Sequence, residues 1–215
     1  MRIRLPVRRA VLFGAMLAVA LAALLPLRLV LGVLDSGLAA RSARGSVWAG
    51  RLEEAQLGAA PLGDLEARLA PAPLLVGLGE VRFVRETSGP DRLRGAIGLS
   101  RTSRALRNVS GPIPAAALFA PLPLATLELS DLSVRFEGGT CVRAEGTVQA
   151  VLAPEAAAAG LPLSLSGRAR CERAALLLPL AGGPGGLALR VFGDGRWEAE
   201  LRAGNASVER LQGRF

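Results

Sequence analysis

Apolar and polar residues alternate with a period of two along much of the chain. In the clearest run, Val142 to Ala150, apolar or small residues alternate with Arg143, Glu145, Thr147 and Gln149. Similar runs occur at 64–69, 92–99, 161–170 and 196–202. A period of two places apolar side chains on one face of a β-strand. The region 41–215 is therefore predicted to form one mostly β, antiparallel domain with a solvated face.

Three segments interrupt this alternation. The apolar phase changes between Leu127 and Phe136, which predicts a bulge or tight turn near Ser130–Asp131. The proline-bracketed segment 112–123 predicts a short helix or an irregular crossing. The GGPGG segment at 182–186 predicts a hairpin or loop connection, because it lacks the Lys-Ser/Thr pair of a phosphate-binding loop.

The N-terminal region predicts a single transmembrane helix at 10–34. Residues 10–27 carry no charge, and the apolar character resumes after Arg28. About 20 apolar residues span a bilayer, and arginines within 1–9 predict a cytoplasmic N-terminus and a periplasmic domain beyond the span. The alternative is a signal peptide cleaved next to small residues such as Ala20, Ala22, Ala39 or Ala40.

The composition argues against most classes of catalytic site. The chain contains no His and no Tyr, so it lacks the usual general base and the usual zinc ligand. No spacing of ligands predicts a metal site or a cofactor site. We therefore expect no catalytic, cofactor-binding or metal-binding residues.

The positive charge is concentrated at the N-terminus. The net charge is +8, and Arg2, Arg4, Arg8, Arg9 and Arg28 all precede the first acidic residue. Nucleic-acid binding requires a basic face, often with stacking aromatic residues. The rest of the chain shows neither feature, so no nucleic-acid partner is expected.

The two cysteines predict a disulfide. Cys141 and Cys171 form an even pair in a chain expected to be exported, which favours a disulfide over a metal site. The alternative is two buried thiols. Cys141 falls in phase with Arg143 and Glu145, so a strand end or a bulge at Cys141 is needed to bring it to Cys171.

Several short motifs follow the predicted membrane span. Gly45, Trp48 and Gly50 form a Gly-x-x-Trp-x-Gly element, and Gly195 and Trp197 belong to an Asp-Gly-Arg-Trp element. The others are Leu62-Gly63, the stretch 72–77, the cysteine and Gly-x-Val strand at 141–148, and the Leu-x-Gly strand and second cysteine within 165–180. Together they resemble the protein N family of the bacterial type II secretion system, over nearly the whole chain.

This resemblance implies a structural role. It implies a bitopic inner-membrane protein whose periplasmic domain contacts other secretion components, either of the inner-membrane platform or associated with the secretin. Lipid would be contacted through the anchor. The family also resembles AsmA-like periplasmic β-proteins, which implies the alternative of a lipid-binding or lipid-transfer module, with small inward residues at Ala144, Gly146, Gly167 and Ala169.

Two further questions stay open at the sequence level. A carboxylate hydrolase would use Glu53 and Glu54, or Glu198 and Glu200, although such pairs are usually solvated strand surface. Trp48 is expected to be a core residue that nucleates the fold, with a membrane-interface anchor as the alternative.

Overall fold

The computed structural model describes residues 7–24, 38–85, 92–158, 161–183, 185–202 and 209–214. The helices are α1 (Val7–Ala23), α3 (Pro71–Leu74) and α4 (Glu155–Ala158). The strands are β1 (Leu38–Ala39), β2 (Ser42–Ser46), β3 (Ala49–Leu57), β4 (Ala60–Ala70), β5 (Gly79–Arg85), β6 (Leu93–Leu99), β7 (Ser103–Pro114), β8 (Leu124–Glu137), β9 (Thr140–Leu152), β10 (Ser164–Arg168), β11 (Arg170–Glu172), β12 (Ala175–Gly182), β13 (Gly185–Val191), β14 (Arg196–Arg202) and β15 (Glu209–Arg214).

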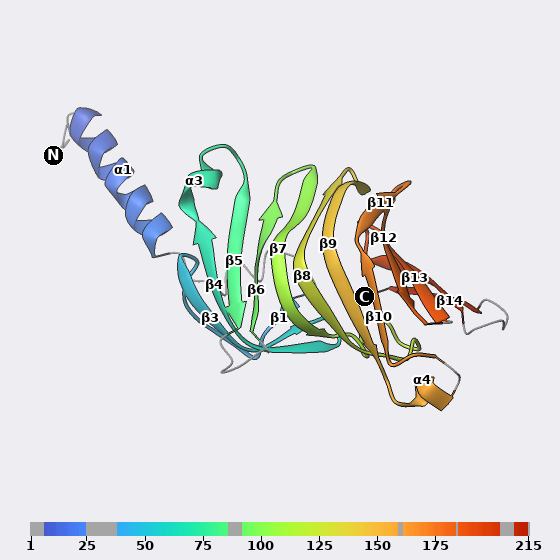
Figure 1. Cartoon of the computed structure of the whole chain (residues 1–215). Coiled ribbons are helices and arrows are strands. Elements are labelled where there is room, and N and C mark those ends of the chain that lie inside the picture. The colour runs from blue at the N-terminus through green and yellow to red at the C-terminus, as the bar shows by residue number, and fades with distance from the viewer. Residues whose placement is uncertain are drawn as a thin grey trace.

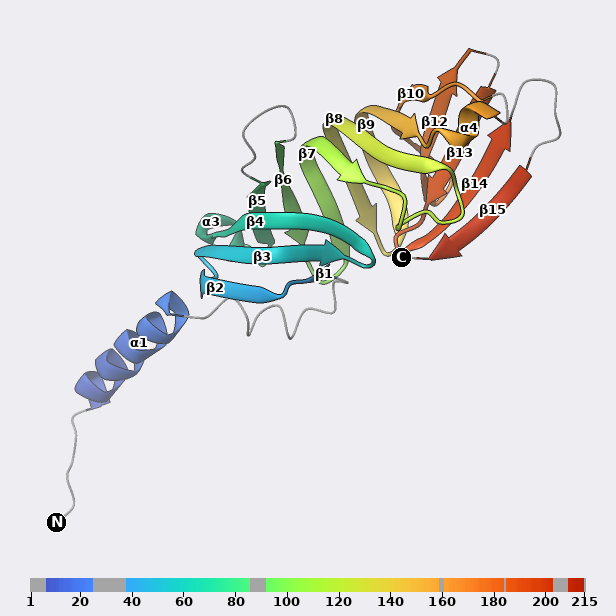
Figure 2. The same cartoon turned by 90° about the horizontal axis from the view of Figure 1, so that it is seen from below.

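The strands form one 15-stranded antiparallel sheet, which confirms the predicted mostly β class. Its order is β1-β3-β4-β5-β6-β7-β8-β9-β10-β12-β13-β14-β15, with β2 paired to β3 and β11 paired to β12. Most strands that are neighbours in the sheet are also neighbours in the chain. The connections between them therefore lie alternately at the two ends of the strands. The sheet is strongly curved, and β3 and β15 lie far apart on either side of the long strands β7, β8 and β9 (Figures 1 and 2).

The N-terminal helix α1 starts inside the predicted cytoplasmic segment. It runs from Val7 to Ala23, a length of 17 residues. Of the helices in the described ranges, none combines the length and the apolar character needed to cross a membrane. The second half of the predicted span, from residue 25 to 34, lies outside the described residues.

The long strands β7 and β8 bend at interlocking bulges. The register shifts between Ser130 and Ser133 on β8 and between Leu106 and Val109 on β7. Asp131 and Asn108 adopt positive φ values of 51° and 48° at these bulges. Bulges of this kind bend a strand and increase its twist. The bulge predicted near Ser130–Asp131 is thus confirmed, and it forms one half of a pair.

Hydrogen bonds between β7 and β8 hold the two bulges together. The Ser110 hydroxyl donates to Asp131 Oδ1 at 3.0 Å, and the Asp131 backbone N–H donates back to Ser110 Oγ at 3.0 Å. On the other side, the Asn108 N–H donates to Ser133 Oγ at 3.0 Å. These bonds satisfy backbone groups that the bulges remove from the sheet ladder.

The core is closed by the curvature of the sheet and by one loop. The connection between β7 and β8 buries Ala115, Leu118, Phe119 and Leu122 in the main apolar cluster. The residues predicted to be a short helix or irregular crossing are thus an irregular segment from 115 to 123 that fills the space inside the sheet. A smaller cluster, centred on Val47, Leu52, Ala55, Leu62 and Leu65, lies between β2, β3 and β4.

One predicted strand is divided in two. The alternation at 161–170 predicts continuous extended chain, but the structure has β10 and β11 separated by Ala169. β10 pairs with both β9 and β12, whereas β11 pairs with β12 alone. The Cβ of any larger residue at Gly167 would lie 2.1 Å from the Pro179 carbonyl oxygen of β12. This close approach explains why a glycine stands here, just before the chain leaves β9 and keeps only β12 as its partner.

Candidate functional site

The Gly45, Trp48 and Gly50 element forms the β2–β3 hairpin. Gly45 pairs with Gly50, and Ser46 pairs with Ala49 across a turn made of Val47 and Trp48. Gly45 has a φ of 87°, and a Cβ at this position would lie 2.5 Å from the Ala49 carbonyl oxygen. Only glycine fits there without strain. Trp48 is half-buried and packs against the smaller apolar cluster.

The Gly195 and Trp197 element forms the turn between β13 and β14. The Phe192 N–H donates to the Arg196 carbonyl at 2.9 Å, and Gly195 adopts a φ of 85°. Asp194 Oδ2 accepts from Arg196 Nε at 2.6 Å. The hydrogen bonds from Arg196 hold the pKa of the Asp194 carboxyl below its usual range. All these polar groups are at the surface and shape the turn.

Trp197 itself points into the core and is 1% exposed. Its ring packs edge-to-face on Phe119, with 5.7 Å between ring centroids and an interplanar angle of 69°. It stands opposite Gly213 of β15, where a Cβ would lie 2.5 Å from the indole. The indole Nε1 is buried without a hydrogen-bond partner among the described residues. Trp197 therefore contributes to the core by packing alone.

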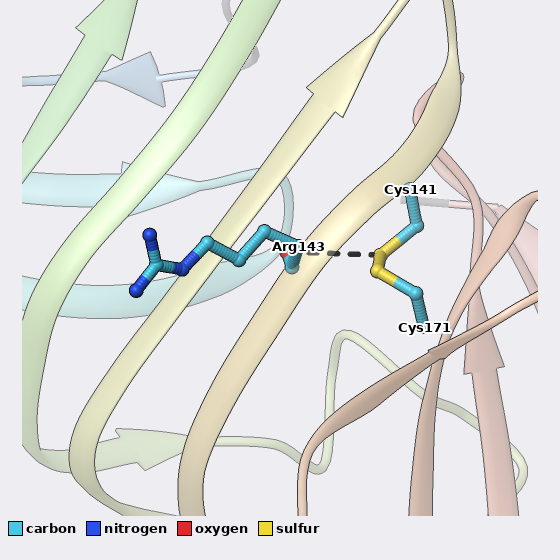
Figure 3. Close-up of a disulfide and its surroundings, with 3 residues drawn as sticks. All are labelled: Cys141, Arg143 and Cys171. Carbon is cyan, nitrogen blue, oxygen red and sulfur yellow. Dashed lines mark hydrogen bonds between the residues drawn. A yellow bond between two sulfur atoms is a disulfide. The ribbon is translucent and has the colours of Figure 1, made fainter.

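The structure contains a disulfide between Cys141 and Cys171, with 5.5 Å between the Cα atoms. The two side chains point toward each other from β9 and β11, and the Arg143 side chain extends away from the sulfurs (Figure 3). Cys141 is the second residue of β9, beside a register shift between Arg135 and Phe136 of β8. A strand end and a neighbouring irregularity thus account for the phase of Cys141 in the sequence.

The carboxylates considered for catalysis lie in surface ion pairs or in solvent. Glu53 accepts from Ser42 Oγ and lies 3.4 Å from Arg44, and Glu54 lies 2.9 Å from Arg41. Glu200 lies 3.5 Å from both Arg190 and Arg210, and Glu198 is exposed on the same face. None of these carboxylates is buried, and no charged or polar residue in the described ranges is.

The described residues offer no grouping for a metal ion. Within them, no set of three or more His, Cys, Asp or Glu side chains is close enough together to hold one. A shallow pocket of about 310 Å³ lies on β7, β8 and β9 and is lined partly by Arg107, Arg135 and Arg143. These arginines lie near Glu80, Glu137 and Glu145 respectively, so the surface is of mixed charge.

Two of the small residues that would permit an apolar groove, Gly146 and Gly167, lie against neighbouring backbone. Gly146 has a φ of 114°, and a Cβ there would lie 2.6 Å from the Leu132 Cα. A Cβ at Gly167 would lie 2.1 Å from the Pro179 carbonyl oxygen of β12, and Ala169 is buried. At Gly146 and Gly167 the neighbouring backbone therefore occupies the space that a side chain would need.

Among the described residues of the β-domain, the most exposed large apolar side chains lie in a turn that sequence reasoning did not single out as a site. Leu75 and Val76, between β4 and β5, are 89% and 74% exposed. In the sequence, Leu75 and Val76 belong to the motif stretch 72–77. The available signal was the absence of any charged residue between Arg68 and Glu80.

The hairpin, the turn, the disulfide and the motif order along the chain can be compared with known families. Residues 36–214 match the family described as type II secretion system (T2SS), protein N. The chain belongs to the type II secretion system protein N family. It is therefore a component of that secretion machinery. No curated protein and no solved structure matches the chain.

Proposed function

We propose that this protein N family member is a bitopic inner-membrane component that supports secretion through protein contacts. In this proposal residues 1–9 are cytoplasmic, 10–34 contain the membrane anchor, and 41–215 form the periplasmic domain. The observation that carries the proposal is the family match over residues 36–214. The uncharged segment 10–27 and the arginines that precede it support the orientation.

Two features of the domain support an exported protein that acts by contact. A disulfide is typical of oxidising compartments, which favours a periplasmic location for the Cys141–Cys171 bond. The mixed-charge surface around Arg107, Arg135 and Arg143 suits recognition of another protein, since complementary charge favours one partner over others. We propose that the partners belong to the inner-membrane platform or associate with the secretin.

The lipid-handling alternative has less support from the packing. It requires an apolar groove beside Gly146 and Gly167, where the backbone of β8 and β12 already fills the space. The segment 115–123 also occupies the inside of the sheet. We therefore propose a contact function without turnover.

The orientation predicts where reporter enzymes are active. A reporter that works only in the periplasm should be active when fused after Phe215 and inactive when fused before Met1. The full-length protein should stay in the membrane after carbonate washing, because an apolar anchor is not extracted by high pH. Recovery of a soluble, shortened periplasmic species would contradict the anchor and indicate a cleaved signal peptide.

The contact function predicts that the Glu198→Gln/Glu200→Gln variant secretes normally. Glu200 makes only ion pairs at 3.5 Å, and Glu198 is exposed. Ion pairs of this kind contribute about 0–1 kcal/mol each. Secreted enzyme activity in the medium, divided by the cellular amount of the variant, should be within twofold of wild type. Loss of secretion by a folded, abundant variant would contradict the proposal and favour a chemical role for these carboxylates.

A further inference from the structure

The turn between β4 and β5 exposes a contiguous set of aliphatic side chains. After α3 ends at Leu74, the chain continues through Leu75, Val76 and Gly77 to Leu78 (Figure 1). The four apolar side chains of this segment are all exposed: Leu74 40%, Leu75 89%, Val76 74% and Leu78 37%. Single exposed leucines are ordinary on a protein surface, but a contiguous apolar set marks a binding surface.

Backbone hydrogen bonds hold this turn in one conformation. The Leu75 N–H donates to the Ala72 carbonyl at 3.2 Å, and the Leu78 N–H donates to the Pro73 carbonyl at 3.0 Å. Gly77 adopts the left-handed conformation, with a φ of 74°, that commonly ends a helical turn. The aliphatic side chains are therefore presented to solvent by a defined structure.

Two exposed arginines lie at the same end of the strands. The β4–β5 and β6–β7 connections lie at the same end of the strands. Gly79 pairs with Leu99, which places Leu78 close to the β6–β7 turn. Arg101 and Arg104 in and after that turn are exposed and form no ion pair within the described part of the chain. Hydrogen bonds from the Ser103 N–H to Ser100 Oγ, at 2.9 Å, order the turn that carries Arg101.

The acidic residues near these arginines are already paired. Glu137, which stands opposite Ser103 in the β7–β8 ladder, forms an ion pair with Arg135. Glu80 lies 3.2 Å from Arg82 and 2.8 Å from Arg107. This end of the sheet therefore exposes aliphatic side chains together with the positive charge of Arg101 and Arg104, which no ion pair in the described chain neutralises. This combination of apolar side chains and cations is the one that interfacial membrane binding requires.

We infer that the β4–β5 turn docks the β-domain on an anionic bilayer. Leu75 and Val76 enter the boundary between headgroups and acyl chains, and Arg101 and Arg104 contact the phosphates. A bilayer fits better than a protein groove because the acidic neighbours Glu80 and Glu137 are already paired with other arginines, which leaves the positive charge of Arg101 and Arg104 unbalanced in the described chain. In both views α3 lies at the end of the sheet nearest α1 (Figures 1 and 2). The inference rests on the proposed function, because the proposed anchor holds the β-domain next to a membrane.

The experiment compares a fluorescent probe at two exposed leucines. Leu75→Cys and Leu163→Cys are made in the full-length protein and labelled with an environment-sensitive fluorophore. Leu163 is 52% exposed and belongs to the β9–β10 connection. This connection lies at the opposite end of the strands, so Leu163 is the matched control. The labelled proteins are reconstituted into vesicles of phosphatidylcholine and phosphatidylglycerol that contain lipids with quenching groups in the acyl chains.

Docking predicts strong quenching and a blue shift at position 75 and neither at position 163. In the Leu75→Cys protein, adding Arg101→Gln and Arg104→Gln should lower the ratio of docked to undocked domain by up to about thirtyfold. High salt should have a similar effect, because it screens the attraction to anionic headgroups. Equal quenching at the two positions, or no effect of the arginine substitutions, would overturn the inference.

Two outcomes separate this inference from the proposed function. A carbonate-resistant protein whose probe at position 75 stays unquenched would keep the anchor and overturn the docking. A protein extracted by carbonate would contradict the anchor, while quenching at position 75 on added vesicles would still support docking. If a photo-crosslinker at position 75 captures a protein in native membranes while the vesicle probe stays unquenched, the turn is a protein contact and the lipid inference is wrong.

Discussion

Replacing Trp197 by Ala is expected to destabilise the domain by about 3–5 kcal/mol, the range observed when a buried aromatic residue is removed from a core. The indole is 1% exposed and packs against Phe119 of the β7–β8 connection. The space that it would leave is bounded by backbone, including Gly213 of β15, so collapse can fill little of it. For a chain of this size the melting temperature should fall by roughly 6–20 °C, measured by circular dichroism.

Two variants serve as controls for this expectation. Trp197→Phe should cost less, because it keeps a ring against Phe119 and loses no hydrogen bond: the Nε1 group has no partner among the described residues. Trp48→Ala should also cost less than Trp197→Ala, because Trp48 is only half-buried in the smaller cluster. If Trp48→Ala were the more damaging substitution, the β2–β3 hairpin would be the main source of stability in place of the sheet interior.

Local patterns predicted the strands well where one strand keeps one set of partners. The alternation at 196–202 coincides with β14, and Trp197 and Ala199 are buried while Glu198 is exposed. At 161–170 the same pattern predicted continuous strand, but the chain loses its pairing with β9 after Arg168 and keeps only β12. The loss of a partner depends on the paths of the neighbouring strands, which a pattern within one strand does not contain.

The two tryptophans show why burial at a site was harder to predict. Trp48 and Trp197 both follow a glycine closely in a short motif, and the sequence predicted a core position for Trp48 and the apolar face of a strand for Trp197. The structure buries Trp197 more deeply, because Phe119 and Gly213 reach it from distant parts of the chain. Trp48 instead occupies a hairpin turn at the sheet edge. The sequence predicted an inward side chain for both tryptophans, and contacts far away in sequence decided how deeply each is buried.

The exposed turn at Leu75 and Val76 could not be predicted from the sequence. A run of apolar residues usually indicates a buried segment, and only the folded sheet shows that nothing in the described chain covers this one. The disulfide was predictable, because two cysteines allow one pairing. The sequence also required an irregularity at Cys141, and the register shift beside Phe136 supplies it.

Removing the Cys141–Cys171 disulfide is expected to destabilise the domain by about 3–4 kcal/mol in the chain-entropy model, for a sequence separation of 30 residues. The cross-link also fastens β11, which otherwise pairs only with β12, to the start of β9. The Cys141→Ala/Cys171→Ala variant should unfold at a lower denaturant concentration than wild type. Mass spectrometry of unreduced wild-type peptides should show the two cysteines linked.

The same bond makes stability depend on the compartment in which the chain folds. Reductant should lower the stability of the wild-type protein toward that of the double variant and leave the double variant unchanged, because only the wild type has a bond to lose. Protein made in a reducing cytoplasm should then be less stable than protein recovered from the periplasm. If both cysteines of the native protein are alkylated without prior reduction, the bond does not form in the cell. Core packing alone must then stabilise the domain, and the disulfide no longer supports a periplasmic location.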